Sequence, residues 1–415
     1  MKSLRELYRI GKGPSSSHTM GPQRAARLFL ERNKGAKAFE VTLYGSLAAT
    51  GRGHMTDVAI TDVLAPVAPV NIVWQASVSL PFHPNAMKFK AFDDEHRMTD
   101  SWTVYSVGGG ALSEGKEAGD MFDTPEVYKL GTMTDIMEWC YSNGRSYWEY
   151  VELCEGRELW DYLHEVWEAM KRSVETGINH EGRLPGPLNL TRKAPTYYVK
   201  ALGYKQSLQS RGLVYAYALA VSEENASGGT IVTAPTCGAC GVLPSVLYHI
   251  WRGHGFKEDR ILNAIATAGL VGNIVKHNAS ISGADVGCQG EVGVACAMAS
   301  AAVCQLFGGS PSQIEYAAEM GLEHHLGMTC DPVCGLVQIP CIERNAFAAT
   351  RALDANLYAS FSDGSHRVSF DKVVKVMKQT GHDLPSLYKE TSQGGLAKGF
   401  ENTYNPSHVI GHLAK

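Results

Sequence analysis

The chain has 415 residues, more than one hydrophobic core usually supports, and we therefore expect two domains. A net charge of −4 and a charged fraction of 19% give no electrostatic reason to expect nucleic acid as a partner. No apolar run approaches the roughly 20 residues that a membrane-spanning helix needs, and the first residues lack the apolar stretch of a signal peptide. The sequence thus predicts a globular, cytoplasmic protein that binds no membrane.

The first 110 or so residues predict mixed α/β structure. A helix is expected over 23–32, because Pro22 precedes a run whose apolar residues have helical spacing. Runs with strand-like alternation or many β-branched and aromatic residues predict strands over 39–45, 70–78, 87–91 and 102–107. The following polar, glycine-containing stretch, 113–150, is interpreted as irregular and as the place of a domain boundary.

From Glu152 onward the sequence favours helices. Long segments rich in alanine, leucine and glycine occur at 213–223, 261–275, 291–306 and 313–322, and strand signals are few. The expected fold is an α/β N-terminal domain over 1–140 and a larger, mostly α-helical C-terminal domain over 150–415.

Residues 13–22 form a dense cluster of small hydrogen-bond donors around a histidine. Hydroxyls of Ser15, Ser16, Ser17 and Thr19, with free backbone N–H groups at a helix N-terminus, would bind an anion such as a carboxylate. His18 beside them could act as acid, base or carboxylate anchor. The alternative is a helix N-cap with no ligand.

A second polar motif, Gly-Arg-Gly-His-Met-Thr-Asp, spans 51–57. Its glycines would expose His54 on a turn, and Thr56 would help the serine segment to hold a carboxylate. An ordinary surface-loop histidine is the alternative. The presence of both motifs in the same small domain favours a shared function.

Three of the ten cysteines stand in unusual settings. Cys288, Cys330 and Cys341 are flanked by glycine, proline, and acidic or amide residues instead of aliphatic ones. Three thiolates can hold a cubane iron–sulfur cluster and leave one iron open as a Lewis acid. The spacing alone does not identify such a site, and Cys334 is a rival third ligand. The polar stretch 277–285 leads into Cys288, and its Asn278 is a candidate donor to the substrate.

The remaining cysteines suggest packing. Cys237 and Cys240 form a Cys-x-x-Cys pair, which can serve redox chemistry or hold zinc, but no second pair completes a zinc site. Cys296 and Cys304 lie among alanine and valine on an expected helix and are most simply core residues.

With these motifs together, the sequence resembles the iron–sulfur-dependent L-serine dehydratases (L-serine ammonia-lyases) of bacteria, in their single-chain form. The resemblance covers nearly the whole chain, and its matching segments are 13–22, 44–47, 50–60, 105–110, 182–188, 234–244, 278–297, 327–346 and 390–397.

The resemblance implies a [4Fe-4S] cluster whose three ligands are Cys288, Cys330 and Cys341. It implies catalytic roles for His18 and His54. The expected substrate contacts are Ser15, Ser16, Ser17, Thr19, Thr56, Asn278 and, in the matching segment 105–110, Ser106 and Gly108. Homodimers are common in this family, so a homodimer acting on a small amino-acid substrate is expected. Well-known members end in a cysteine that can occupy the open iron, whereas residues 405–415 here contain none, and His408 or His412 could substitute for it.

The expected reaction is the elimination of water from L-serine, which yields pyruvate and ammonia. The open iron would stabilise the departing oxygen, and His18 or His54 would remove the α-proton; the sequence does not assign the two roles. Alternative interpretations are the same chemistry on L-threonine or L-cysteine, a pyridoxal-phosphate enzyme built around Lys276, and a non-catalytic iron–sulfur redox sensor.

Overall fold

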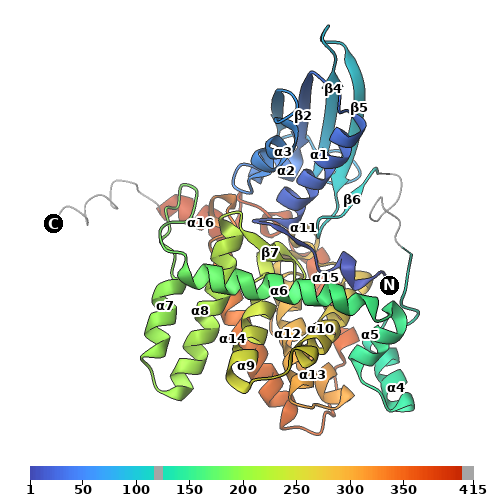
Figure 1. Cartoon of the computed structure of the whole chain (residues 1–415), viewed down its shortest axis with the longest axis vertical. Coiled ribbons are helices and arrows are strands. Elements are labelled where there is room, and N and C mark those ends of the chain that lie inside the picture. Colours follow the sequence, from blue (N-terminus) through green and yellow to red (C-terminus); the bar gives the residue numbers. More distant parts are fainter. Residues whose placement is uncertain (116–124, 404–415) are drawn as a thin grey trace, which may run out of the picture.

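The structure is a computed structural model that describes residues 1–115 and 125–403. Its chain forms two lobes, and Figure 1 shows a small sheet-containing lobe standing on a larger helical one. Residues 405–415, which include His408 and His412 as the suggested substitutes for a terminal cysteine, lie outside the described residues.

The small lobe is built on a five-stranded sheet in the order β3-β2-β4-β5-β6. Only the β2–β3 pair is parallel, and the other neighbours are antiparallel. Parallel neighbours need a crossover connection, and helices α2 (Gly45–Thr50) and α3 (Thr56–Leu64) form it. The strands are β2 (Ala38–Tyr44), β3 (Val70–Gln75), β4 (Ala86–Phe92), β5 (Met98–Ser106) and β6 (Leu112–Ser113).

An aromatic core joins this sheet to helix α1 (Gly21–Arg32). Phe29 of α1 lies with its ring centroid 5.3 Å from that of Phe89 on β4 and 6.4 Å from that of Trp102 on β5. Along β4 the alternate residues Met87, Phe89 and Ala91 are fully buried, as expected for a strand with one face on a core. The predicted helix and four strands are confirmed, with β5 beginning four residues earlier than expected.

The N-terminal segment belongs to the large lobe before it enters the small one. Leu4, Leu7 and Tyr8 are buried in the large hydrophobic core. Strand β1 (Ile10–Lys12) then pairs antiparallel with β7 (Thr230–Val232), and Asn225 Nδ2 donates to Pro14 O at 2.9 Å. The serine segment, residues 13–20, is therefore fixed to the large lobe at its start and to α1 of the small lobe at its end.

The large lobe is helical, which confirms the expected fold class. Its helices are α4 (Met133–Asn143), α5 (Tyr147–Glu155), α6 (Glu158–Asn179), α7 (Ala194–Leu202), α8 (Gln206–Ala226), α9 (Val242–His254), α10 (Glu258–Asn278), α11 (Gly283–Val286), α12 (Val292–Leu306), α13 (Pro311–Glu323), α14 (Cys341–Ser360), α15 (Phe370–Asp383) and α16 (Gly395–Thr403). Short helical turns precede or follow several of them, at Leu4–Glu6, Ser16–Met20, Cys237–Ala239, Gly287–Gln289, Val333–Gly335 and Ser386–Tyr388.

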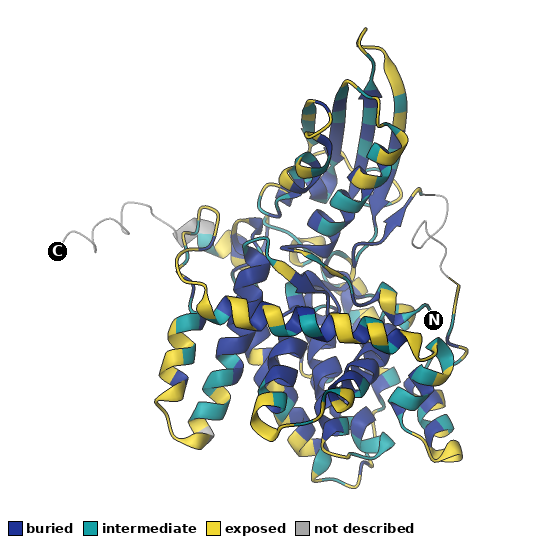
Figure 2. Cartoon of the chain, in the orientation of Figure 1, coloured by how far each residue is buried: buried dark blue, intermediate teal, exposed yellow. Residues whose placement is uncertain are grey.

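Helix α12 lies at the centre of this lobe and packs against α9, α10, α13 and α14. It is buried almost all round, because small residues let the neighbouring helices approach closely: a Cβ on Gly321 of α13 would lie 2.9 Å from Ala297. Figure 2 shows buried residues concentrated on the inner helices of the lobe. Cys296 and Cys304 are part of this core, as the sequence indicated.

One interpretation is wrong: residues 113–150 are not irregular throughout, since α4 lies within them and α5 begins there. Each helix carries its own start signal. The side chain of Thr132 accepts from Asp135 N at the start of α4, and Ser146 and Glu149 form a capping box at the start of α5. The expected boundaries, 1–140 and 150–415, stay a prediction; the buried residues of the small core run from Ala25 to Leu112.

No single helix in the described ranges is long and apolar enough to cross a membrane. One bent pair, Gly283–Gln289 with Val292–Leu306, passes that test by length and composition. Its longer member is α12, which the surrounding helices cover.

Candidate active site

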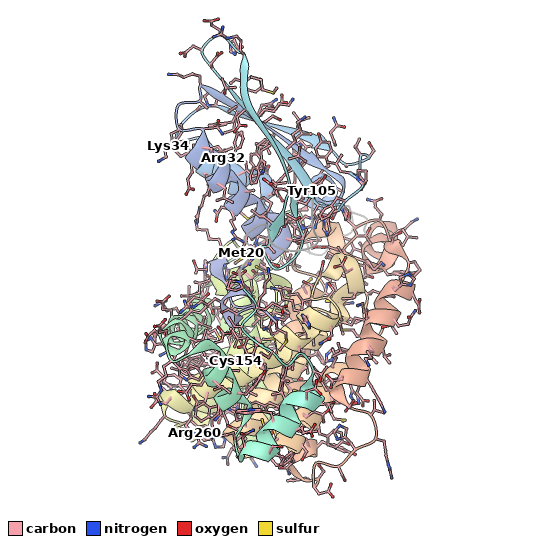
Figure 3. The ribbon with its side chains drawn as sticks, turned by 90° about the vertical axis from the view of Figure 1, so that its right-hand side faces the viewer. Met20, Arg32, Lys34, Tyr105, Cys154 and Arg260 are labelled. Carbon is pink, nitrogen blue, oxygen red and sulfur yellow. The ribbon has the colours of Figure 1, made fainter. Side chains whose placement is uncertain are left out.

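A narrow cavity of about 30 Å³ lies where the two lobes meet, large enough for one or two water molecules. Both lobes and the segment that links them contribute to its walls. The lining residues are Pro14, Ser15, Ser16, Ser17, His54, Gly108, Gly109, Thr236, Gly238, Ile281, Ser282, Gly283, Glu291, Cys330, Pro332, Val337, Cys341 and Glu390. Met20, at the end of the serine segment, lies at the junction of the lobes (Figure 3), and its sulfur is 3.8 Å from that of Cys237.

The serine segment forms a single π-helical turn, Ser16–Met20, that continues into α1. Ser15 is its N-cap: the side chain accepts from His18 N at 3.0 Å, while Ser15 N donates to Thr19 Oγ1 at 3.1 Å. Ser15, Ser16 and Ser17 all line the cavity. The expected cap and the expected cluster of donors are thus both present.

His18 is fully buried, and both of its ring nitrogens have partners. Nδ1 lies 3.0 Å from Ser17 Oγ and 3.4 Å from Glu390 Oε1, and Nε2 lies 3.1 Å from Ser46 Oγ. Burial, with a smaller contribution from His54, lowers the pKa of His18 well below its usual value. His18 is therefore held in place by its neighbours and does not line the cavity.

His54 does line the cavity, and its ring centroid is 4.6 Å from that of His18. Its Nδ1 lies 3.1 Å from Thr50 Oγ1, and the Thr50 hydroxyl donates its proton to Ser46 O at 3.0 Å. Since that hydroxyl has one proton, it accepts from Nδ1–H, which assigns the lone pair of the imidazole to Nε2. Nε2 has no hydrogen-bond partner in the described part of the chain. Burial lowers the pKa of His54 to about 4, so the ring is neutral at pH 7.

Of the other predicted substrate contacts, one lines the cavity, and all the rest except Asn278 make structural contacts next to it. Gly108 lines the cavity. Thr19 Oγ1 donates to His54 O at 2.6 Å, and Thr56 Oγ1 donates to His18 O at 2.5 Å, so these hydroxyls tie the two histidine segments together. Ser106 is fully buried beside Gly21, where a Cβ would lie 2.4 Å from its Oγ.

Asn278 is not brought to the cavity. Its Nδ2 donates to Gly131 O at 2.8 Å and to Ile274 O at 2.9 Å, which ties the end of α10 to the loop before α4. Lys276, the lysine of the pyridoxal-phosphate alternative, also lies outside the cavity lining, and its Nζ donates to Glu6 O at 3.0 Å.

Cys330 and Cys341 line the large-lobe side of the cavity, and Cys288 is buried next to Cys330. The Cys330 thiol is within hydrogen-bonding range of Cys288, and this contact lowers the pKa of Cys288 while burial opposes it. Burial raises the pKa of Cys341, and the negative charge of a Cys288 thiolate raises it further. The Arg344 guanidinium also reaches the Cys288 sulfur, so a cation is present to balance anionic sulfur.

The rival cysteines lie elsewhere. Cys334 is exposed and does not line the cavity. Cys237 and Cys240 are buried, and burial raises the pKa of both thiols, as expected for packed cysteines. All ten cysteines are within the described ranges and none forms a disulfide.

Two acidic residues to which the sequence analysis assigned no role also line the cavity. Glu291 Oε1 accepts from Thr236 Oγ1 at 2.8 Å, and its Oε2 lies 3.6 Å from the Cys330 sulfur. Burial raises the pKa of Glu291 and of Glu390 to about 7. The available signals were weak: Glu291 follows Cys288 by three residues, and Glu390 begins the segment 390–397 noted in the family resemblance.

Comparisons with known proteins agree on one family. The family described as serine dehydratase beta chain matches residues 3–72, and the one described as serine dehydratase alpha chain matches residues 78–397. Curated relatives named L-serine dehydratase include one from Streptomyces coelicolor, 41% identical over 95% of this chain and 98% of the relative. Another, from Haemophilus influenzae, is 40% identical over 96% and 99%, and L-serine dehydratase 1 of Escherichia coli is 38% identical over the same shares.

The matched residues contain every group that lines the cavity, from the serine segment to Glu390. The chain therefore belongs to the serine dehydratase family, with the parts described as beta and alpha chains joined in one polypeptide.

Proposed function

We propose that this protein converts L-serine to pyruvate and ammonia by eliminating water. Relatives that align over nearly the whole chain are named L-serine dehydratase. The observation that carries the proposal is the cavity itself, because it combines serine hydroxyls, a histidine with a free ring nitrogen and two cysteines in one small volume.

We propose a [4Fe-4S] cluster as the cofactor, held by Cys288, Cys330 and Cys341. The chemistry of the donor set fits such a group: Cys330 and Cys341 line the cavity, Cys288 is buried beside Cys330, and Arg344 supplies positive charge next to Cys288. When bound, a cluster with three protein ligands supplies a Lewis acid that makes the substrate hydroxyl a better leaving group.

The serine segment would hold the substrate carboxylate. Ser15, Ser16 and Ser17 line the cavity on a single turn whose shape is fixed by its own hydrogen bonds. A fixed carboxylate orients the α-carbon, and orientation is one of the larger contributions to enzymatic rate.

His54 is the proposed general base. Its Nε2 carries the lone pair and is free, whereas both nitrogens of His18 are occupied. Removal of the α-proton by Nε2 lets the C–H electron pair form a Cα–Cβ double bond as hydroxide leaves the β-carbon. The resulting aminoacrylate tautomerises to an imine, which water hydrolyses to pyruvate and ammonia. His18 is then a positioning residue that fixes Ser17 and, through its main-chain oxygen, Thr56.

The test is anaerobic reconstitution with iron and sulfide, followed by a pyruvate assay with serine and by parallel assays of the 2-oxo acid products from threonine and cysteine. We expect serine to give the highest kcat/KM, with threonine or cysteine as the secondary substrate. His54→Ala should lower turnover by about two to four orders of magnitude, the usual contribution of a positioned proton-transfer group. Bound iron without pyruvate formation would contradict the proposed reaction and favour the redox-sensor alternative, and full activity without iron would contradict the cofactor proposal.

A homodimer is proposed as the working form. Large apolar side chains are exposed on α7, α8 and α14, for example Val199, Leu208 and Phe347, and Phe361 directly after α14 is exposed too. Large apolar side chains that stay exposed in the single chain would be covered if this face were an interface between two copies. Light scattering that gives the mass of a single chain at micromolar concentration would contradict it.

A further inference from the structure

The chemistry proposed above leaves one part of the substrate without a partner. An amino acid carries an α-ammonium group, and a buried cation requires an anionic or hydrogen-bonding partner. None of the described residues that line the cavity is lysine or arginine, whereas two of them, Glu291 and Glu390, are acidic. The lining therefore includes acidic groups that could bind a cation and no basic group that would repel one.

Glu390 enters the cavity from a segment that the large lobe holds on both sides. Cys330 N donates to Tyr388 O at 2.8 Å, and Thr391 N donates to Cys330 O at 3.1 Å. Between these two anchors Glu390 has a φ of +47°, a left-handed conformation that a residue with a Cβ rarely adopts. Such conformations persist where the surrounding structure fixes them, and they occur frequently at functional sites.

The two oxygens of the Glu390 carboxyl have different surroundings. Oε1 accepts from Ser17 Oγ at 3.4 Å and lies 3.4 Å from His18 Nδ1. Oε2 is buried and has no hydrogen-bond partner among the described residues. An unpaired buried carboxylate oxygen is costly, and a native site that keeps one is explained by a ligand that completes it.

Glu291 has no carboxylate oxygen that is similarly without a partner. Its Oε1 already accepts from Thr236, and its Oε2 lies beside the Cys330 sulfur. Of the two acidic residues in the lining, Glu390 alone has an oxygen with no protein partner.

We propose that Glu390 binds the α-ammonium group of the substrate through Oε2 and so makes the site selective for amino acids over the corresponding hydroxy acids. The inference rests on the proposed function and extends it to the recognition of a group that does not react. In this arrangement the single proton of the Ser17 hydroxyl goes to Glu390 Oε1, so the hydroxyls of Ser15 and Ser16 are left to donate to the substrate carboxylate. An ammonium ion held by a carboxylate and a carboxylate held by hydroxyls would together orient the α-carbon.

The experiment compares L-alanine with L-lactate on the full chain carrying its cofactor. The two molecules differ only in the ammonium or hydroxyl group on the α-carbon, and neither has a β-hydroxyl to eliminate. Binding is measured by ligand-observed NMR and by competition against L-serine turnover. The parent should bind L-alanine more tightly than L-lactate. Glu390→Gln should weaken L-alanine binding by about 10- to 100-fold, the usual loss for a charge-assisted hydrogen bond, and should leave L-lactate binding within about twofold.

Two further variants serve as controls. Glu40→Gln removes a carboxylate on β2 that pairs with Lys90 outside the cavity, and it should change neither affinity. Glu390→Asp keeps the charge but shortens the side chain; it should retain part of the preference for L-alanine, and it replaces the glutamine variant if that protein does not fold.

The outcomes separate this inference from the proposed function. If the parent makes pyruvate and Glu390→Gln keeps the parental ratio of L-alanine to L-lactate affinity, the inference is wrong and the function stands. If turnover falls while both affinities are unchanged, Glu390 only positions His18 and the inference is again wrong. If the parent makes no pyruvate but shows a Glu390-dependent preference for L-alanine, the proposed function is wrong and the inference stands. A parent that binds L-alanine no better than L-lactate also overturns the inference.

Discussion

Replacing Thr50 with valine should slow catalysis even though Thr50 does not line the cavity. Its hydroxyl accepts from His54 Nδ1–H because its own proton is donated to Ser46 O. Valine has nearly the same shape as threonine and carries a methyl group in place of the hydroxyl. The substitution therefore removes the acceptor and leaves the packing in place.

The size of the effect follows from the hydrogen bond that is lost. A neutral hydrogen bond contributes about 0.5–1.5 kcal/mol net, and each ~1.36 kcal/mol changes a rate tenfold. Without its acceptor the imidazole no longer favours the tautomer with a free Nε2, so kcat should fall by about 2- to 13-fold. KM should change little, since no contact to the substrate is removed.

The assay is pyruvate formation from L-serine under anaerobic conditions, with iron content and thermal unfolding measured on the same preparations. Thr50→Ser keeps the hydroxyl and should retain most of the parental kcat. Parental kcat in a folded, iron-loaded Thr50→Val protein would show that Nδ1–H needs no acceptor. An equal fall in the serine and valine variants would show that the methyl group, not the hydroxyl, matters.

Three other outcomes are expected. Cys341→Ser should lose bound iron and visible absorbance, whereas Cys334→Ser should keep both; equal iron in the two preparations would remove Cys341 from the ligand set. Burial lowers the pKa of His325 from 6.5 to about 4, so the unfolded chain takes up the proton first as the pH falls. Urea unfolding should therefore show that the parent loses about 2 kcal/mol more stability between pH 7 and 5 than His325→Gln does. Asn278→Ala removes two hydrogen bonds at the end of α10 and should cost about 1–3 kcal/mol of stability with KM unchanged; a raised KM with unchanged stability would restore Asn278 as a substrate contact.

Much of the fold was predictable because its signals are local. Alternation of buried and partly exposed residues along β4, and the proline at the start of α1, depend only on neighbours in sequence. The same holds for the cap at Ser15, whose partner His18 is three residues away. The caps of α4 and α5 are equally local, but Gly131, Gly144 and the polar residues around Thr132 and Ser146 are also typical of irregular loops, so the sequence signals conflict there.

The candidate site was predictable in its parts but not in its assembly. Nothing near Ser17 in the sequence indicates Glu390, which lies 373 residues further along the chain. The role of Thr50 was equally hidden, since threonine at a helix end is common and only its two hydrogen bonds distinguish it. Long-range pairing of this kind leaves no period or motif in a single sequence, so it emerges only with the tertiary structure.

The junction between the lobes also affects how the protein should lose activity when it is heated. His54 lies between α2 and α3 of the small lobe, Cys288 and Cys330 are buried in the core of the large lobe, and the serine segment with His18 joins the two lobes. If the two lobes shifted relative to each other at this junction, His54 would move away from the cysteines while each core kept its helices and strands. Loss of turnover on gentle heating should thus precede loss of the far-ultraviolet circular dichroism signal, and rapid cooling should recover it.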